Sequence, residues 1–457
     1  MFFTAKRAVR VGLLLLLGVA YSVQAAETKS PNIVFILSDD QAWTDYGFTG
    51  HPVIKTPHLD RLAARSAWFP RGYVPTALCR PSLATLVTGL YSHQHKISGN
   101  DPSHDLAKPN TPAYAAYQAK LIAHIDEHPT VPKLLGAKGY VSHQSGKWWE
   151  GSFQRGGFTE GMTRGFPNPG GRHGDDGLKI GREGLKPVLD FIDASVEKQK
   201  PFYVWYAPLL PHSPHNPPER LLAKYRDKVP SIHVARYYAM CEWFDETCGE
   251  LIDHVEKRGQ TSNTLFVYIA DNGWIQDPQS PNFALRSKQS PNEGGTRQPI
   301  LFSWPGVIKP GKRSELASSI DIVPTMLAAA QVPVPSNLPG LNLLPYLSEG
   351  KEIPRDSLYG EACSHDVADI DDPEASLLYR WTIEGRWKLI LTYDGKLGRY
   401  AEVHPRKELR PQLFDLESDP TEEHNVAASH PEIVARLAKK LQDWYPVTHR
   451  KVLATWE

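Results

Sequence analysis

The sequence repeats one local pattern, a short apolar run that ends in polar side chains. Its first example is NIVFILSDD, which ends in Asp39 and Asp40. Thr56 and Pro57 follow, a pair typical of the N-cap and first turn of a helix. A buried strand followed by a helix predicts a parallel sheet. We therefore expect an α/β fold with a mostly parallel central sheet flanked by helices.

Three later runs end in the same way. GYVSHQSGK ends in Lys147, PFYVWYAPLLPHSPH ends in His212 and His215, and TLFVYIADN ends in Asp271 and Asn272. Ligands of open α/β sheets bind outside the carboxyl ends of the strands. We therefore expect these polar side chains to meet in one site.

The character of the sequence changes after about Pro345. The segment LYRWTIEGRWKLILTYDG predicts two strands joined by Glu384 and Gly385, and PEIVARLAKKLQDWY predicts an amphipathic terminal helix. We expect a large domain over residues 27–345 and a smaller C-terminal α+β subdomain over residues 350–457.

The first residues predict a signal peptide over residues 1–25. Lys6, Arg7 and Arg10 precede the apolar run VGLLLLLGVA, and small residues follow around Ala25. The apolar run is much shorter than the roughly 20 residues that a membrane-spanning helix needs. We therefore expect a periplasmic or secreted protein with no stable membrane anchor.

Charge and cysteine content exclude some classes of protein. The chain of 457 residues has 51 Lys and Arg against 51 Asp and Glu, so its charge favours neither nucleic acid nor an acidic membrane as a partner. An anionic substrate would have to be bound by local positive groups. Cys241 and Cys248 lie seven apart in a predicted helix, about 10 Å along its axis, which is too far for a disulfide. Cys363 has no obvious partner either.

Four oxygen donors follow two of the predicted strands, and they suit a hard divalent cation such as calcium: Asp39, Asp40, Asp271 and Asn272. Two unrelated turns would also explain them, because Asp-Asn-Gly is common in turns. Cys79 begins a predicted helix in ALCRPSLATLVTG. A thiolate is soft and does not belong in a calcium site, which suggests that Cys79 does not remain a cysteine.

These motifs together resemble those of a known family. CRPS with the helix LATLVTG, after NIVFILSDDQ and before GKWW, PHSPH, DNG and NEGGTRQP, resembles the type I sulfatases of the alkaline-phosphatase-like superfamily. The resemblance spans roughly residues 31–430 and implies that residues 27–345 form a sulfatase catalytic domain. It also implies that a maturation enzyme oxidises Cys79 to formylglycine. Calcium would then be held by Asp39, Asp40, Asp271, Asn272 and the modified Cys79.

The resemblance further implies a mechanism. One hydroxyl of the hydrated aldehyde would attack sulfur and release the alcohol, and loss of the proton of the other hydroxyl would expel sulfate. Lys147 and Lys288 match the family's active-site lysines, and His212 matches the histidine that supports the leaving oxygen. The alternative is that the lysines are ordinary solvated side chains and that His212 and His215 cap loops.

Two positions depart from the family pattern. The family usually has arginine four residues after the modified cysteine, where this chain has Leu83, which leaves the maturation of Cys79 open. The family commonly reads Gly-Lys-Trp-His where this chain has Trp149, and an indole cannot accept the second proton. We expect His93, His95 or His143 to take over as the base, and spacing alone does not rank them.

Family resemblance and export imply a sulfated polysaccharide or its oligosaccharides as the substrate. Several polar loop residues are candidates to contact it: Asn100, Asp101, His104, Arg172, His173, His215, His365 and Asp366. One alternative is a noncatalytic relative that binds sulfated glycans. The other is a phosphoester or phosphonate hydrolase of the same superfamily. Related phosphatases typically hold zinc, which prefers nitrogen and sulfur donors, and the set of Asp and Asn residues named above offers neither.

Overall fold

The computed structural model describes residues 1–2, 30–406 and 408–454. The signal peptide expected over residues 1–25 therefore lies, apart from its first two residues, outside the described residues. None of the helices in the described part of the chain is both long and apolar enough to cross a membrane.

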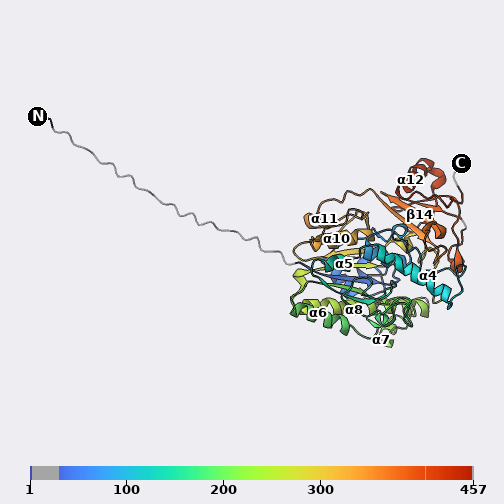
Figure 1. The fold of residues 1–457 in the computed structure, drawn as a ribbon. Coiled ribbons are helices and arrows are strands. Elements are labelled where there is room, and N and C mark those ends of the chain that lie inside the picture. Colours follow the sequence, from blue (N-terminus) through green and yellow to red (C-terminus); the bar gives the residue numbers. More distant parts are fainter. Residues whose placement is uncertain (3–29, 407, 455–457) are drawn as a thin grey trace.

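A central eight-stranded sheet forms the middle layer of the molecule (Figure 1). Its strands, in spatial order, are β10 (Gly311–Lys312), β2 (Ala67–Phe69), β9 (Ile300–Ser303), β8 (Thr264–Ala270), β1 (Asn32–Ser38), β7 (Phe202–Ala207), β5 (Val141–Gly146) and β6 (Glu160–Gly161). β1 pairs in parallel with both β7 and β8, and β5 pairs in parallel with β7. Only β9 runs antiparallel to its neighbours in this sheet. The predicted mostly parallel sheet is confirmed.

Helices cover both faces of the sheet, because alternate residues of its strands point to opposite sides. Ile33, Phe35 and Leu37 of β1 pack into one core cluster, whereas Val34 and Ile36 pack into another. The first face carries α2 (Cys79–Thr88), α5 (Val131–Gly136), α10 (Ile322–Ala329) and α11 (Leu344–Glu349). The second face carries α1 (Pro57–Ala64), α6 (Lys186–Glu197) and α8 (Ile232–Lys257). In Figure 1, α5 and α10 lie above the sheet and α6 and α8 below it.

Helix α1 begins at Pro57, as predicted, with Thr56 as its N-cap residue. The Thr56 hydroxyl does not cap the helix, however. It donates to Asp60 Oδ1 at 2.8 Å and accepts from the Gly47 N–H at 2.8 Å. The backbone N–H groups of His58 and Leu59 instead donate to the carboxylate of Asp245 on α8. The start of α1 is therefore capped from another helix.

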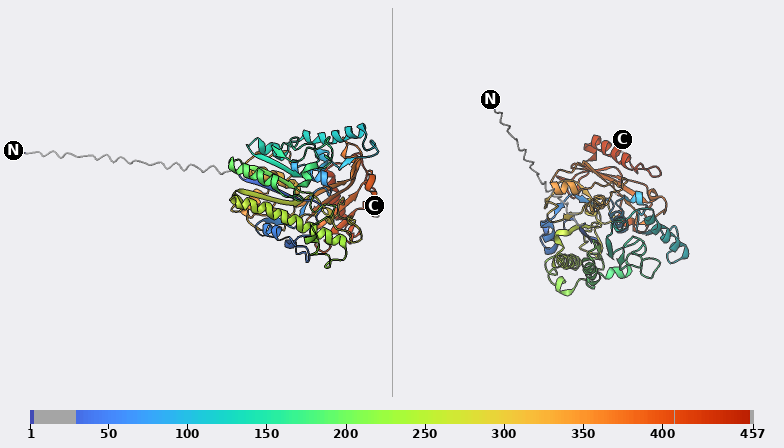
Figure 2. Two further views of the ribbon diagram at one scale, coloured as in Figure 1. Left: turned by 90° about the horizontal axis from the view of Figure 1, so that it is seen from below. Right: turned by 60° about the vertical axis from the view of Figure 1, so that its left-hand side comes forward.

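The C-terminal part forms an antiparallel sheet in the order β12 (Ser357–Cys363), β14 (Leu377–Glu384), β15 (Trp387–Thr392) and β16 (Gln412–Asp415), covered by α12 (Pro431–Trp444). Figure 2 shows this sheet and α12 on one side of the molecule. The predicted hairpin and terminal helix are confirmed. The turn is displaced by one residue, because Glu384 still pairs with Trp387 and leaves Gly385 and Arg386 as the connection.

Short elements complete the fold: β3 (Gly72–Tyr73), α3 (Ser92–His95), β4 (Asp101–Pro102), α4 (Pro112–Ala123), α7 (Glu219–Leu222), α9 (Glu293–Thr296), β11 (Ala317–Ser318) and β13 (Asp366–Val367). β13 of the C-terminal part pairs in parallel with β4. All four cysteines are buried and free, so the expectation of no disulfide scaffold is confirmed.

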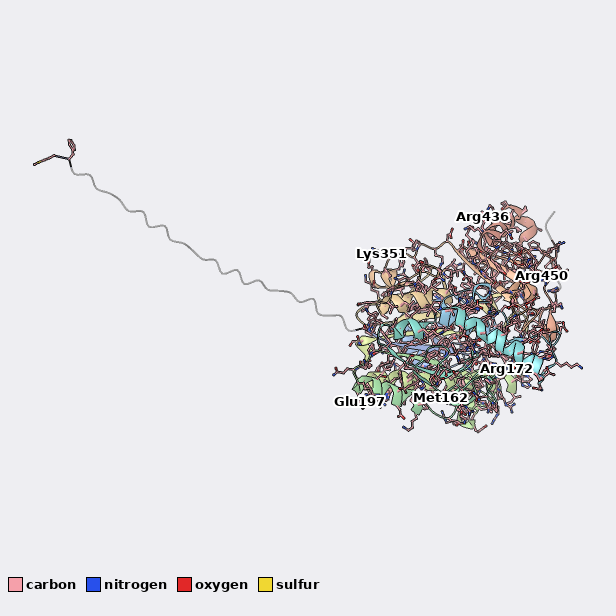
Figure 3. All side chains as sticks on the ribbon, in the orientation of Figure 1. Met162, Arg172, Glu197, Lys351, Arg436 and Arg450 are labelled. Atoms are coloured by element: carbon pink, nitrogen blue, oxygen red, sulfur yellow. The ribbon has the colours of Figure 1, made fainter. Side chains whose placement is uncertain are left out.

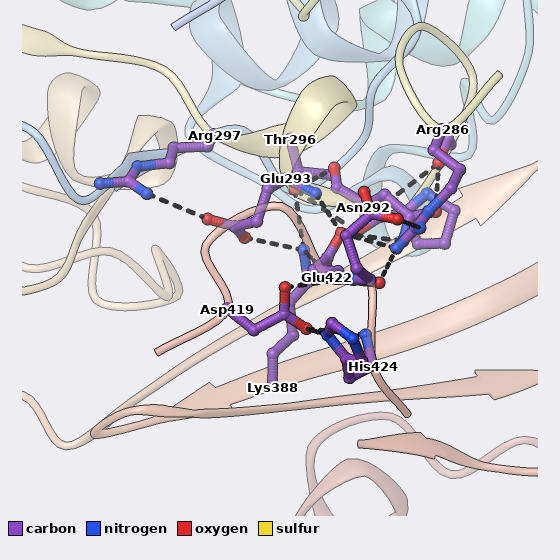
Figure 4. A network of polar contacts seen from close by, with 12 residues as sticks. Arg286, Asn292, Glu293, Thr296, Arg297, Lys388, Asp419, Glu422 and His424 are labelled. Atoms are coloured by element: carbon purple, nitrogen blue, oxygen red, sulfur yellow. Dashed lines mark hydrogen bonds and ion pairs between the residues drawn. The ribbon is translucent and has the colours of Figure 1, made fainter. Parts of the chain in front are cut away.

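A buried ion network joins the C-terminal sheet to the rest of the protein (Figure 4). Lys388 of β15 is fully buried, and its Nζ lies 2.9 Å from Glu293 Oε1 and 3.0 Å from Glu422 Oε1. Glu422 Oε2 also accepts from Asn292 Nδ2 and from the Glu293 N–H, both at 2.8 Å. The segment around α9 is therefore fixed to the C-terminal sheet by charges that no solvent reaches.

Candidate active site

Four parallel strands bring the polar groups of the candidate site to one edge of the sheet. Asp39 and Asp40 follow β1, Lys147 follows β5, and Asp271 and Asn272 follow β8. His212 lies in the loop after β7. As expected from the pattern of strand ends, these side chains lie together.

Ion pairs connect the acids of the cluster with two buried lysines. Lys147 Nζ lies 2.7 Å from Asp39 Oδ1, and Lys288 Nζ lies 2.6 Å from Asp40 Oδ2. Nε2 of His212 is 3.3 Å from the same Asp40 oxygen. Asn272 Nδ2 donates to Asp40 Oδ1 at 2.6 Å. These contacts leave the lysines at the edge of a pocket, where they face any anion that enters.

Backbone conformation turns both acids into the cluster. In a regular strand, successive side chains would point to opposite faces. Asp40 has a φ of 63° instead, and its N–H donates to Asp271 Oδ1 at 3.1 Å. Gly146 has a φ of 83°, and a Cβ there would lie 1.8 Å from the Ala207 carbonyl oxygen. Only glycine fits this close approach, which directs the next residue, Lys147, into the site.

Cys79 is the first residue of α2 and is 2% exposed. Its sulfur lies within 4.8 Å of ligand atoms of Asp39, Asp40 and His212. The helix is held in place because Ser82 Oγ donates to the Asp271 carbonyl at 2.5 Å and the Arg80 N–H donates to Asn100 Oδ1 at 3.1 Å. The positive end of the α2 dipole therefore faces the cluster.

The cluster fits a hard cation. Oδ2 of Asp39, Oδ2 of Asp271 and Oδ1 of Asn272 are buried and have no hydrogen-bond partner. Burial raises the pKa of Asp39 and that of Asp271. For Asp40, burial is outweighed by Lys288 and His212, and its pKa is lowered. Unpartnered buried oxygens are costly, and an oxygen-coordinated ion such as calcium would satisfy them.

The cysteine and the lysines differ sharply in their charge state. Burial raises the pKa of Cys79 to about 12, so an unmodified thiol stays protonated at neutral pH and is a poor nucleophile. Burial alone would lower the pKa values of Lys147 and Lys288, but Asp39 and Asp40 outweigh it and raise them. Both lysines therefore remain charged, so the site offers positive charge to an anion and lacks a reactive thiolate.

A pocket of about 230 Å³ opens over Cys79. Asn100, Lys147, His173, His212, Lys288 and His365 belong to its wall, together with Trp149, Arg172, Trp274, Gln289 and Tyr400. Figure 3 labels Arg172, which in this view lies apart from Glu197 at the end of α6. Glu197 ends α6 shortly before β7 begins at Phe202, so it lies near the amino ends of the strands. Arg172, which lines the pocket, lies away from that end.

The expected substrate contacts fall into two groups. Asn100 and His365 line the pocket, and Asn100 Nδ2 lies 3.2 Å from His365 Nε2. Asp101 and Asp366 lie behind that wall, where they bind Arg172, Arg399 and His365 Nδ1. His215 does not belong to the pocket wall, because its ring packs against Tyr237 and Trp274. His104 is exposed and packs against Tyr114.

Comparison with known proteins identifies the family. Residues 31–332 match the family model described as Sulfatase, and residues 285–445 match the model described as N-sulphoglucosamine sulphohydrolase, C-terminal. The chain belongs to the sulfatase family. It is of the type I group within the alkaline-phosphatase-like superfamily, and its enzyme class is that of the sulfuric ester hydrolases.

Relatives cover almost the whole sulfatase chain. Human arylsulfatase A is 28% identical over 493 residues, covering 93% of this chain and 89% of that protein. An N-acetylgalactosamine-6-O-sulfatase of Bacteroides thetaiotaomicron is 24% identical, and the match covers 94% of this chain and 97% of that protein. The crystal structure of Ps i-CgsB in complex with k-i-k-neocarrahexaose has a TM-score of 0.70 at 26% identity, covering 91% of this chain and 92% of that one. A phosphonate monoester hydrolase of Agrobacterium radiobacter, 20% identical with a TM-score of 0.66, shares the fold.

The two departures from the family pattern have clear surroundings in this sulfatase. Leu83 is buried in the core on the first face of the sheet. Arg80 cannot replace the missing arginine, because its guanidinium forms a buried two-point ion pair with Glu150, each contact 2.7 Å long. Trp149 lines the pocket, with the Arg172 guanidinium 4.7 Å from its ring.

The three histidines expected to replace the missing base do not line the pocket. The backbone and Nδ1 of His93 bind Glu361, and its ring stacks on Tyr445 at 3.9 Å. His95 Nε2 contacts Thr85 Oγ1 at 3.2 Å. His143 points from β5 toward Phe191 and belongs to a separate surface pocket. The structure therefore contradicts this expectation, because none of the three lies in the pocket wall. The wall contains other histidines, and among them His173 packs beside Trp149.

Proposed function

We propose that this sulfatase is exported and removes sulfate esters from a sulfated polysaccharide or its oligosaccharides. The observation that carries the proposal is the buried cluster beside Cys79, where three carboxylates meet two charged lysines and unpartnered oxygens. Such a site holds a cation and, next to it, an anion. A carbohydrate substrate is supported by the sulfated-sugar names of the relatives and by the oligosaccharide complex of a structural neighbour.

The proposed calcium would be held by Asp39, Asp40, Asp271, Asn272 and residue 79. Bound there, calcium would polarise a sulfate oxygen, and formylglycine made from Cys79 would supply a hydrated aldehyde as the nucleophile. Lys147 and Lys288 would neutralise the sulfate oxygens. His212 would assist the leaving oxygen, with Nδ1 fixed 2.6 Å from the Ser213 carbonyl. Asn100 and His365, across the pocket, would contact the sugar.

Peptide mass spectrometry of residue 79 is the experiment that tests this proposal. The protein should be purified from a host that matures other sulfatases and assayed for sulfate release with and without a calcium chelator. We expect formylglycine at position 79 and sulfate release that the chelator abolishes. Unmodified cysteine, no sulfate release and retained binding of sulfated glycans would instead indicate a noncatalytic relative.

A further inference from the structure

Three histidines line the pocket over Cys79, and two of them are already engaged. His212 contacts Asp40 and the Ser213 carbonyl, and His365 contacts Asp366 and Asn100. The third is His173, whose Nδ1 is buried without a hydrogen-bond partner. Among the described pocket residues, His173 is therefore the one histidine with an uncommitted ring.

His173 is also fixed against the residue that replaces the family histidine. Its ring centroid lies 5.1 Å from that of Trp149, at an interplanar angle of 44°. The Trp148 N–H donates to the His173 carbonyl at 3.4 Å, which ties the two loops together through their backbones. Trp149 is only 4% exposed, so its indole is a rigid support for the imidazole.

Burial and the nearby positive charges keep His173 neutral. Burial is the largest cause, followed by Lys147 and Arg172, and together they lower the pKa of His173 to about 3 despite the opposing charge of Asp101. Near neutral pH the imidazole is therefore neutral and has a free lone pair, although the same positive charges make it a weaker base than an ordinary histidine. It can therefore accept a proton, which an indole cannot do.

We propose that His173 is the catalytic base that takes the last proton of the reaction in place of the histidine missing at Trp149. This inference rests on the proposed function. Before the step, the side-chain carbon of residue 79 carries one hydroxyl and one sulfate ester. His173 takes the hydroxyl proton, and the O–H electron pair forms the C=O bond. The C–O bond to sulfate breaks, and sulfate leaves with its electrons. The proton on His173 then passes to water.

The test compares His173→Ala and His173→Asn with wild type by mass spectrometry of residue 79 during turnover. A lost base should lower kcat by roughly 100-fold or more, with KM much less affected. The first alcohol should still be released, in an amount equal to the enzyme, and sulfated residue 79 should accumulate. A merely structural role would slow both steps and would not trap the sulfated residue.

A second variant restores the family residue. In the His173→Ala background, Trp149→His should recover much of the lost kcat and abolish the accumulation of sulfated residue 79. The matched control is His424→Ala, because the His424 side chain is 82% exposed and lies outside the pocket. It should behave as wild type.

Two results would overturn the assignment to His173. One is a kcat within a few-fold of wild type in both His173 variants, and the other is a large loss with no trapped sulfate and no recovery by Trp149→His. Unchanged melting temperatures of the variants would exclude misfolding as the cause. Absence of sulfate release by wild type is a different failure, because it contradicts the proposed function itself.

Discussion

At the scale of single residues, the site depends on charges that are buried in pairs. Lys147 and Asp39 are 2% and 3% exposed and meet at 2.7 Å. Neither charge has water to replace its partner, so removing one member of the pair costs more than breaking a surface ion pair of the same length. The lysine that would bind sulfate therefore also stabilises the acids around it.

Replacing Lys147 with methionine should leave the Asp39 carboxylate buried beside Asp40 and Asp271 without its cation. We expect a loss of about 3–5 kcal/mol in the free energy of unfolding, as measured for broken buried pairs, in urea titrations with a chelator present. If calcium occupies the cluster, its addition should recover part of this loss. Lys186→Ala is the control, because that lysine is 83% exposed and its loss should change stability by less than about 0.5 kcal/mol.

His365 should act on substrate binding and not on the chemical step. It lines the pocket, but its ring is held by Asn100 and Asp366, and its centroid lies 4.4 Å from that of Tyr400. His365→Ala should therefore raise KM by several-fold while kcat changes little. Steady-state kinetics on a sulfated oligosaccharide would check this. A large fall in kcat at constant KM would place His365 in the chemistry instead.

At the scale of elements, α1 shows how one helix can complete another. The carboxylate of Asp245, within α8, accepts from the Leu59 N–H at 2.7 Å and from the His58 N–H at 3.1 Å. These N–H groups belong to the first turn of α1, which its own N-cap side chain leaves unsatisfied. The contact fixes α1 against α8 over the second face of the sheet.

Removal of this cap should destabilise the protein without changing the pocket. We expect Asp245→Ala to cost about 1–2 kcal/mol of unfolding free energy, with Asp245→Asn losing less because one acceptor oxygen remains. The neighbouring Glu246 pairs with Arg220 at the surface, so Glu246→Ala should stay within about 0.5 kcal/mol of wild type. Equal stability of Asp245→Ala and Glu246→Ala would contradict the role of the cap.

The elements themselves were predictable where the pattern of the sequence is local. The strand after residue 31, the start of α1 at Pro57, the C-terminal hairpin and α12 all follow from apolar periodicity and turn residues. The cap that Asp245 provides for α1 was not predictable, because it joins residues 186 positions apart. The positive φ of Asp40 has no local signal either, although it decides where two of the acids point.

Within the candidate site, the strand-end residues were predictable with their partners. Of the loop candidates, Asn100, Arg172, His173 and His365 do line the pocket, but their partners there were not predictable. Strand ends converge because a parallel sheet must bring them to one edge. His173 lies in a loop with no periodicity, and only the fold shows that it packs on Trp149. His93, His95 and His143 lie outside the pocket wall, and their spacing in the sequence could not reveal this.

At the scale of the whole molecule, Lys388 connects the C-terminal sheet to α9. Its ammonium group is fully buried between Glu293 of α9 and Glu422 (Figure 4). Burial, followed by repulsion from Glu293, raises the pKa of Glu422, and Lys388 opposes this rise. The same C-terminal part carries His365 and Tyr400 to the pocket, so its attachment also fixes part of the pocket wall.

Replacing Lys388 with methionine should leave two carboxylates buried together, at a cost of about 3–5 kcal/mol. The C-terminal part should become sensitive to protease before the large domain does, and kcat/KM should fall with it. The triple variant that adds Glu293→Gln and Glu422→Gln removes the unpaired charges and should regain much of the stability. Limited proteolysis and urea titration of both variants would measure this. A single variant as stable as wild type would contradict the proposed role of the network.

The burial of Cys79 also has a consequence in time. Its side chain is 2% exposed, and all ten residues of α2 are buried. In the folded protein, residue 79 is therefore out of reach of a modifying enzyme. Any conversion of residue 79 must therefore come between synthesis and folding. If residue 79 is converted in this way, the fraction of converted molecules would be fixed when the protein folds and would not rise afterwards.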